Sequence, residues 1–206
     1  GLGAGGARVA RPDDDGDDGG EPGGPSGPDA VAVAVVLPRT GGDDGRALKE
    51  GSLYCEAAEG THAYGIGSHR HGPEIEQILS DAAGRPNVVN FTPHLMPMNR
   101  GMLSSIYVKT RPGVSADDLR TTLLQRYAEE PFVQILPQGV SPQTRHVRGT
   151  NTTHIGIFAD RVKGRAMVFS VIDNLMKGAS GQAVQNFNVM YGLPETMGLD
   201  QTPLFP

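Results

Sequence analysis

The residues best suited to chemistry lie between positions 68 and 77, which read S-H-R-H-G-P-E-I-E-Q. Proline favours the first turn of a helix, and acidic side chains are stabilised there, so this stretch predicts a helix start. We therefore expect His69, Arg70 and His71 just before a helix N-terminus, where backbone amides bind anions. Together with two imidazoles, this arrangement predicts a place that holds a phosphate or a carboxylate and moves a proton.

An H-x-H pair also has an ordinary interpretation, in which one histidine faces the core and the other faces solvent. A metal centre would need a third or fourth ligand at suitable spacing. No such set of cysteines and histidines is visible, so we expect no metal. The other histidines are scattered along the chain, at His62, His94, His146 and His154.

The elements that position these residues follow from periodicity and from turn signals. Apolar residues at helical spacing predict a helix over 73–83, and Ser115 is a good N-cap for a second helix. A third helix is expected over about 179–190. Strands are expected over 30–37, 87–95, 102–109 and 132–136, and as a pair over 147–162 and 165–172. The first of these strands is interpreted as an isolated remnant or an edge strand. Irregular alternation with hairpins predicts an α+β fold, with a mixed or antiparallel sheet and helices on one face.

Composition narrows the possible functions. The chain has 206 residues and a formal net charge of −5. It contains no basic run, so nonspecific nucleic-acid binding is not expected. No apolar stretch is long enough to span a membrane, and no targeting segment is visible. Residues 1–29 are rich in glycine, proline and aspartate and are predicted to be disordered, which leaves 30–206 as the folded domain.

Several long segments carry a family resemblance. They include H-A-Y-G-I-G-S-H-R-H-G-P-E-I-E-Q (62–77), F-T-P-H-L-M-P-M-N-R-G-M-L (91–103) and I-D-N-L-M-K-G-A-S-G-Q-A-V-Q-N-F-N (172–188). With G-R-A-L-K-E-G-S-L-Y-C-E (45–56) and G-L-P-E-T-M-G-L (192–199), they make 45–206 closely resemble the C-terminal half of the N-acetyl-γ-glutamyl-phosphate reductases. The resemblance implies a glyceraldehyde-3-phosphate-dehydrogenase-like C-terminal domain that forms a homodimer or a larger homo-oligomer. Aspartate-semialdehyde dehydrogenases share the K-G-A-x-G-x-A-V-Q style of segment but not the H-R-H-x-P-E-I run.

The resemblance also implies a reaction and its residues. In this family a cysteine thiolate displaces phosphate from N-acetylglutamyl phosphate to form a thioester, which NADPH reduces to the semialdehyde of arginine biosynthesis. His69 matches the general acid/base histidine, and His71 and Glu74 line the same pocket by that analogy. Arg100 is a candidate for holding a substrate carboxylate or phosphate, although a surface arginine at a strand start is an equally good interpretation. Asn151 is a similar candidate.

Residues 174–182 resemble the family segment that approaches the nicotinamide end of NADP(H). The glycines allow close backbone approach, and the helix that follows offers a positive end. The alternative is a glycine-rich helix entry with only a packing role. The residues expected to contact the cofactor are Asn174, Lys177, Gly178, Gly181 and Gln182.

The sequence also departs from the family. The glycine-rich dinucleotide loop and the G-C-Y-P nucleophile motif of the N-terminal half are not found in these residues, and Cys55 lies in L-Y-C-E. We interpret Cys55 as a structural or surface cysteine and expect the chain to be inactive alone. The alternatives are a noncatalytic dimerisation scaffold and an aspartate-semialdehyde-type domain. An apolar patch on the last helix, at Val184, Phe187 and Met190, is expected to be exposed. The expected compartment is the plastid stroma in a plant or alga and the cytoplasm otherwise.

Overall fold

The computed structural model describes residues 30–38 and 59–204. The segment 1–29 and Cys55 lie outside the described residues, so the predicted disorder and the division into 1–29 and 30–206 stay predictions. None of the described helices is both long and apolar enough to cross a bilayer.

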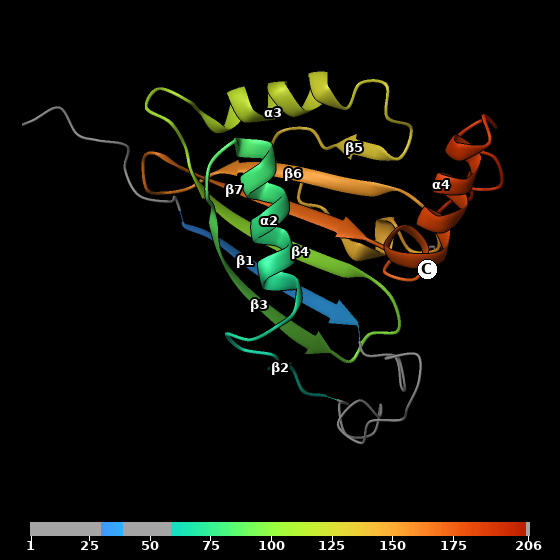
Figure 1. Ribbon diagram of the computed structural model, residues 1–206, viewed down its shortest axis with the longest axis horizontal. Coiled ribbons are helices and arrows are strands. Elements are labelled where there is room, and N and C mark those ends of the chain that lie inside the picture. Colours follow the sequence, from blue (N-terminus) through green and yellow to red (C-terminus); the bar gives the residue numbers. More distant parts are fainter. Residues whose placement is uncertain (1–29, 39–58, 205–206) are drawn as a thin grey trace, which may run out of the picture.

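The strands of the described residues form one sheet of seven, in the order β2-β3-β1-β4-β7-β6-β5 (Figure 1). β1 is parallel to β3 and β5 is parallel to β6, whereas the other neighbours are antiparallel. The predicted α+β fold with a mixed sheet is confirmed. The strands are β1 (Ala30–Pro38), β2 (His62–Ala63), β3 (Val88–Met96), β4 (Met102–Lys109), β5 (Val133–Ile135), β6 (Thr153–Ala159) and β7 (Arg165–Ile172).

β1 corrects one expectation, because it is neither isolated nor at the edge of the sheet. It lies between β3 and β4, where Val33 pairs with Phe91 on one side and with Ile106 on the other. Val33 and Val35 are buried. A continuous run of alanine and valine without charges is typical of a strand with neighbours on both sides, which is why the central position suits this segment.

Helix α2 (His71–Ala83) covers one face of this part of the sheet and lies in front of it in Figure 1. Ile75 packs with Phe91 of β3 against the buried cluster of Val33, Val35 and Val89. Glu76 strengthens the attachment, because its carboxylate accepts a hydrogen bond from the backbone N–H of Val89 at 2.9 Å. The helix begins two residues earlier than predicted, so His71 is its first residue.

Helix α3 (Ala116–Arg126) packs against β6 and β5. Ser115 is its N-cap, as predicted, and the Ser115 hydroxyl accepts a hydrogen bond from the Asp118 N–H at 3.1 Å. The Asp118 carboxylate in turn accepts one from the Ser115 N–H at 2.8 Å, which completes a capping box.

The segment before β6 is not the extended strand that was predicted from residue 147. A 3₁₀ turn, η2 (Thr144–His146), and a further turn precede β6, and they bury Val147, Thr150 and Asn151 completely or nearly so. The side chain of Thr150 forms a hydrogen bond with the backbone of this segment, because its hydroxyl donates to the Val147 carbonyl oxygen at 2.8 Å. Such local bonds favour a turn over a strand.

The last helix begins irregularly. A π-helical turn, η3 (Met176–Ser180), leads directly into α4 (Gly181–Met190). The side chains of Val184, Phe187 and Met190 are 42%, 52% and 80% exposed, so the expected apolar patch on α4 is confirmed in this chain.

The strand directions bring several segments to one edge of the sheet. β1, β3 and β7 end at this edge and β4 and β6 begin there, as Figure 1 shows on the side where α4 lies. The segments that connect these strand ends carry Arg100, Asn151, Asp173 and Asn174. Residues far apart in the sequence therefore meet at this edge.

Candidate active site

His69 lies just before α2 and is surrounded by aromatic rings. Its ring centroid is 5.3 Å from that of Tyr64, 4.8 Å from that of His71 and 5.2 Å from that of Phe91. Gly65 makes this packing possible: a Cβ atom at that position would be 2.9 Å from His69 Cδ2. Phe91 belongs to β3, so the His69 ring packs against the sheet.

The electrostatics of this place favour a neutral imidazole. Burial, followed by the positive charges of His71 and Arg70, lowers the pKa of His69 below 6.5. The backbone N–H of His71 donates to His69 Nδ1 at 3.2 Å. In the neutral ring the proton is therefore on Nε2, where it is available for donation.

The two residues predicted to lie beside His69, His71 and Glu74, differ in their contacts with it. His71 contacts His69 directly, through its ring and through its backbone N–H. Glu74 lies in the first turn of α2 and its side chain is exposed. Glu76, which was not selected from the sequence, is the glutamate that anchors this helix to β3.

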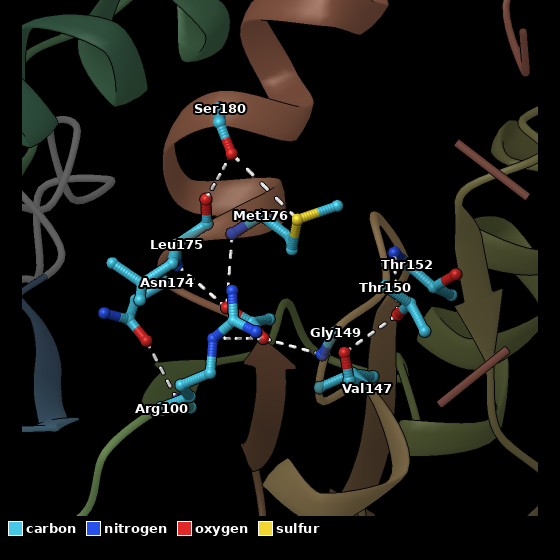
Figure 2. Close-up of polar contacts among 11 residues, drawn as sticks. Arg100, Val147, Gly149, Thr150, Thr152, Asn174, Leu175, Met176 and Ser180 are labelled. Carbon is cyan, nitrogen blue, oxygen red and sulfur yellow. Dashed lines mark hydrogen bonds and ion pairs between the residues drawn. The ribbon is translucent and has the colours of Figure 1, made fainter. Parts of the chain in front are cut away.

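Arg100 belongs to a second cluster, at the sheet edge (Figure 2). Its Nε atom lies 3.2 Å from Oδ2 of Asp173, and the Asp173 side chain is fully buried whereas that of Arg100 is 26% exposed. The interpretation of Arg100 as an ordinary surface arginine is therefore not supported. Gly101, the next residue, donates its N–H to Asn174 Oδ1 at 2.9 Å.

Asp173 is the centre of this cluster and was missed by the sequence analysis. Oδ2 accepts a hydrogen bond from the Gly149 N–H at 2.7 Å, and Oδ1 accepts from the N–H groups of Leu175 and Met176 at 2.8 and 3.2 Å. One carboxylate thus joins the end of β7, the turn at Gly149 and the start of η3. The sequence signal that could have identified Asp173 is the position of an acidic residue directly after an apolar strand.

Asn151 is also buried, and its contacts lie within the chain. Its Nδ2 donates to Gln185 Oε1 at 2.8 Å, and Lys177 Nζ donates to the same oxygen at 2.7 Å. Gln185 donates in turn to Glu195 Oε1 at 2.6 Å. Burial lowers the pKa of Lys177, and the charge of Glu195 opposes this effect. These hydrogen bonds hold α4 against the turn before β6, so the contacts of Asn151 position this helix.

The predicted cofactor residues divide into two groups. Asn174, Lys177 and Gly181 are used inside the chain, and a Cβ atom at Gly181 would collide with Asn151 Oδ1 and with the backbone of Met176. Gly178 is exposed, and a Cβ atom there would make only ordinary contacts, with Ile172 Cδ1 at 3.4 Å. Gln182 donates to Asn186 Oδ1 at 3.0 Å on α4. Gly178 is thus exposed, whereas the other four residues are engaged in contacts within the chain.

The two clusters are separate in their contacts. His69 contacts Tyr64, His71 and Phe91, whereas Arg100 and Asp173 contact residues 149 and 173–176. No group of three or more metal-ligating side chains with suitable geometry occurs among the described residues.

Comparisons with known proteins agree with these features. Residues 28–174 match the family described as semialdehyde dehydrogenase, dimerisation domain. The chain is 65% identical over 162 residues to N-acetyl-gamma-glutamyl-phosphate reductase of Rhodospirillum rubrum, and this match covers 79% of the chain and 46% of the relative. It is 57% identical over 162 residues to a probable N-acetyl-gamma-glutamyl-phosphate reductase, chloroplastic, of Arabidopsis thaliana, of which it covers 40%. The chain thus spans about half the length of the curated relatives it matches.

Solved structures support the fold. The crystal structure of aspartate semialdehyde dehydrogenase II from Vibrio cholerae has a TM-score of 0.60 at 16% identity, and the match covers 79% of this chain and 55% of that one. The resemblance that was read from the sequence segments is confirmed. The match to the family description covers most of the chain and includes both the His69 site and Arg100, and it places the chain in the semialdehyde dehydrogenase dimerisation domain family.

Proposed function

We propose that this chain is the substrate-binding and dimerisation half of an N-acetyl-γ-glutamyl-phosphate reductase and that His69 is its general acid/base. The observation that carries the proposal is the neutral, ring-packed His69, which lies in a segment shared with relatives of that name. In its neutral form His69 donates a hydrogen bond from Nε2–H to a thiolate or to a developing oxyanion of the substrate, and after it has taken up a proton the imidazolium donates that proton as a general acid. Its lowered pKa keeps it in this form at pH 7.

The remaining chemical groups come from outside the described residues. We propose that the nucleophilic thiol belongs to a nucleotide-binding half that is not part of these 206 residues. When NADP(H) is bound, it supplies the hydride, and Gly178 and Gln182 are the residues of this chain that would contact it. Arg100 would bind an anionic group of the substrate, whereas Asn151 would act by positioning α4.

The assembly and the compartment follow from the family. The chain forms a homodimer in this proposal, which light scattering of the purified chain tests directly. Two plant relatives are named chloroplastic. A plant or algal source would therefore place the protein in the plastid stroma, and another source would place it in the cytoplasm.

Reconstitution tests the reaction. The 206-residue chain is assayed alone and after mixing with the nucleotide-binding half of the Rhodospirillum rubrum relative, with N-acetylglutamate semialdehyde, phosphate and NADP. We expect no turnover from the chain alone and measurable turnover from the mixture. His69→Asn should lower this turnover by about 100-fold or more, as removal of a general acid/base does. His62→Asn, an exposed histidine of β2, is the matched control and should leave it unchanged.

Two results would contradict the proposal. If the mixture has no turnover although both parts are folded and associated, the noncatalytic dimerisation scaffold is the better function. If the chain alone is active and Cys55→Ser abolishes the activity, the thiol is supplied by this chain and not by another half.

A further inference from the structure

Residues 200–204 follow α4 and the turns after it, and they reach back to the turn that precedes β6. Leu199, just before this segment, is buried, whereas residues 200–204 are exposed. At Leu204 the segment meets the turn, because the Leu204 N–H donates to the Arg148 carbonyl oxygen at 2.8 Å. A short exposed span is thus fixed at both of its ends. We call residues 200–204 the strap.

The side chain of Leu204 lies directly on Gly149. A Cβ atom at Gly149 would be only 2.9 Å from Cγ and from Cδ1 of Leu204, so a larger residue there would push the leucine away. Gly149 also has a φ of 80°, which glycine adopts without strain. The strap therefore contacts this turn through one side chain and one hydrogen bond, and Leu204 is still 60% exposed.

Gly149 is also one of the residues that hold Asp173. Its N–H donates to Asp173 Oδ2 at 2.7 Å, and the Nε atom of Arg100 lies 3.2 Å from the same oxygen (Figure 2). A shift of the Gly149 N–H would therefore move the oxygen that Arg100 contacts. Direct contacts thus connect Leu204 through Gly149 and Asp173 to Arg100.

The strap is held more weakly than the cluster that it covers. The Asp173 side chain is fully buried and bonded on both oxygens, whereas the strap is exposed. Exposed segments with few buried contacts open locally without unfolding the rest of a protein. We propose that docking of the strap on Gly149 holds Asp173 against Arg100, with Leu204 as a positioning residue. Only its consequence for substrate binding rests on the function proposed above, in which Arg100 binds an anionic group.

Hydrogen exchange of the full chain, followed by NMR, tests the proposal at two donors, the Gly149 N–H and the Arg100 Nε–H. Leu204→Ala should speed exchange at both about 10-fold, as expected when roughly one hydrogen bond's worth of docking is lost. Leu204→Met nearly preserves the side-chain volume and should keep exchange slow. Leu124→Ala is the matched control, because this leucine of α3 is 40% exposed, and it should change neither rate.

Two results of this experiment would overturn the proposal. If Leu204→Ala speeds exchange at Gly149 but not at Arg100, the strap merely covers the turn and Leu204 is not a positioning residue. If exchange stays slow at both donors, the strap does not hold the cluster at all. The Arg100 signal is identified by its absence in Arg100→Lys, since lysine has no Nε–H of this kind.

A pair of glycine variants tests the contact from the other side. Gly149 and Gly139 have almost the same φ, 80° and 79°, so alanine strains both backbones alike. Nothing lies within 4 Å of a Cβ atom at Gly139. Gly149→Ala should therefore shift the methyl signals of Leu204 and speed exchange at Arg100, and Gly139→Ala should do neither. Unchanged Leu204 signals in Gly149→Ala would overturn the docking.

The consequence for substrate is measured in the reconstituted reductase. Leu204→Ala should raise the KM of one anionic substrate, the semialdehyde or phosphate, while kcat changes less, since Arg100 is proposed to bind and not to react. Leu204→Met should restore this KM. An unchanged KM together with faster exchange at Arg100 would keep the strap and overturn the substrate role of Arg100. Failure of the strap and failure of the proposed function are therefore distinguished.

Discussion

The His69 site and the Asp173 cluster are built in opposite ways. His69 is held mainly by ring packing, and three of the residues around it, Tyr64, Gly65 and His71, are close to it in the sequence. Asp173 is held by polar contacts to residues on three separate segments, at Arg100, Gly149 and the start of η3. The comparison teaches that the His69 site is a local feature that packs against the sheet, whereas the Asp173 cluster exists only when the sheet edge is assembled.

Removal of the Asp173 carboxylate should give the largest effect. Asp173→Ala deletes an ion pair and three backbone hydrogen bonds inside the protein, so we expect a loss of about 3 kcal/mol or more in the free energy of unfolding. Urea denaturation measures it. Asp160→Ala, which removes an exposed bond to the Val162 N–H, is the matched control and should cost about 1 kcal/mol or less. Similar losses in both variants would refute the central role of Asp173.

Two glycines test the packing of His69. Gly65 and Gly67 both have a positive φ, of 57° and 66°, so alanine strains either position by about 1 kcal/mol. Only at Gly65 would the new Cβ atom meet His69, while nothing lies within 4 Å of it at Gly67. We expect Gly65→Ala to be the less stable variant and to shift the NMR signals of the His69 ring, which Gly67→Ala leaves in place. Identical spectra for the two variants would contradict the close packing.

The positively charged neighbours of His69 should have a smaller effect, which depends on pH. The pKa of His69 is lowered by burial and then by His71 and Arg70, so His71→Gln should raise this pKa, and Arg70→Gln should raise it less. An NMR titration of the His69 ring follows both. Because the unfolded chain binds a proton that folded His69 resists, the contribution of His69 to stability declines as the pH falls below 6.5. A larger shift in Arg70→Gln than in His71→Gln would be inconsistent with this order of causes.

The smallest effect is expected at the capping box of α3, which is as local as the His69 site but purely structural. Ser115→Ala removes the bond to the Asp118 N–H and should cost about 1 kcal/mol. Thermal unfolding measures the loss, while the His69 ring signals should stay in place. A change in those signals would mean that α3 and the His69 site are coupled.

The difference between local and distant contacts also explains what the sequence predicted. The helix start at residues 71–73 and the cap at Ser115 depend on neighbours within a few residues, and the pattern of residue types reveals them. The burial of Asn151 and the contacts of Asp173 depend on which strand ends share an edge. That information lies in the strand order, which periodicity does not contain. The strand predicted from residue 147 was wrong for a related reason, since its residues turn inward to meet Asp173 and Leu204.

The central place of β1 has a consequence for how the protein forms. β3 and β4 follow one another in the sequence, yet they do not pair, because β1 lies between them and comes from a distant part of the chain. The sheet therefore closes only after a long-range pairing, and such pairings slow folding. Until β1 is inserted, β3 and β4 have unpaired edges, and open edges recruit strands of other molecules. When the chain is synthesised at high concentration, copies of it should therefore be prone to exchange strands. This exchange should begin at the unpaired edges of β3 and β4, in the middle of the sheet.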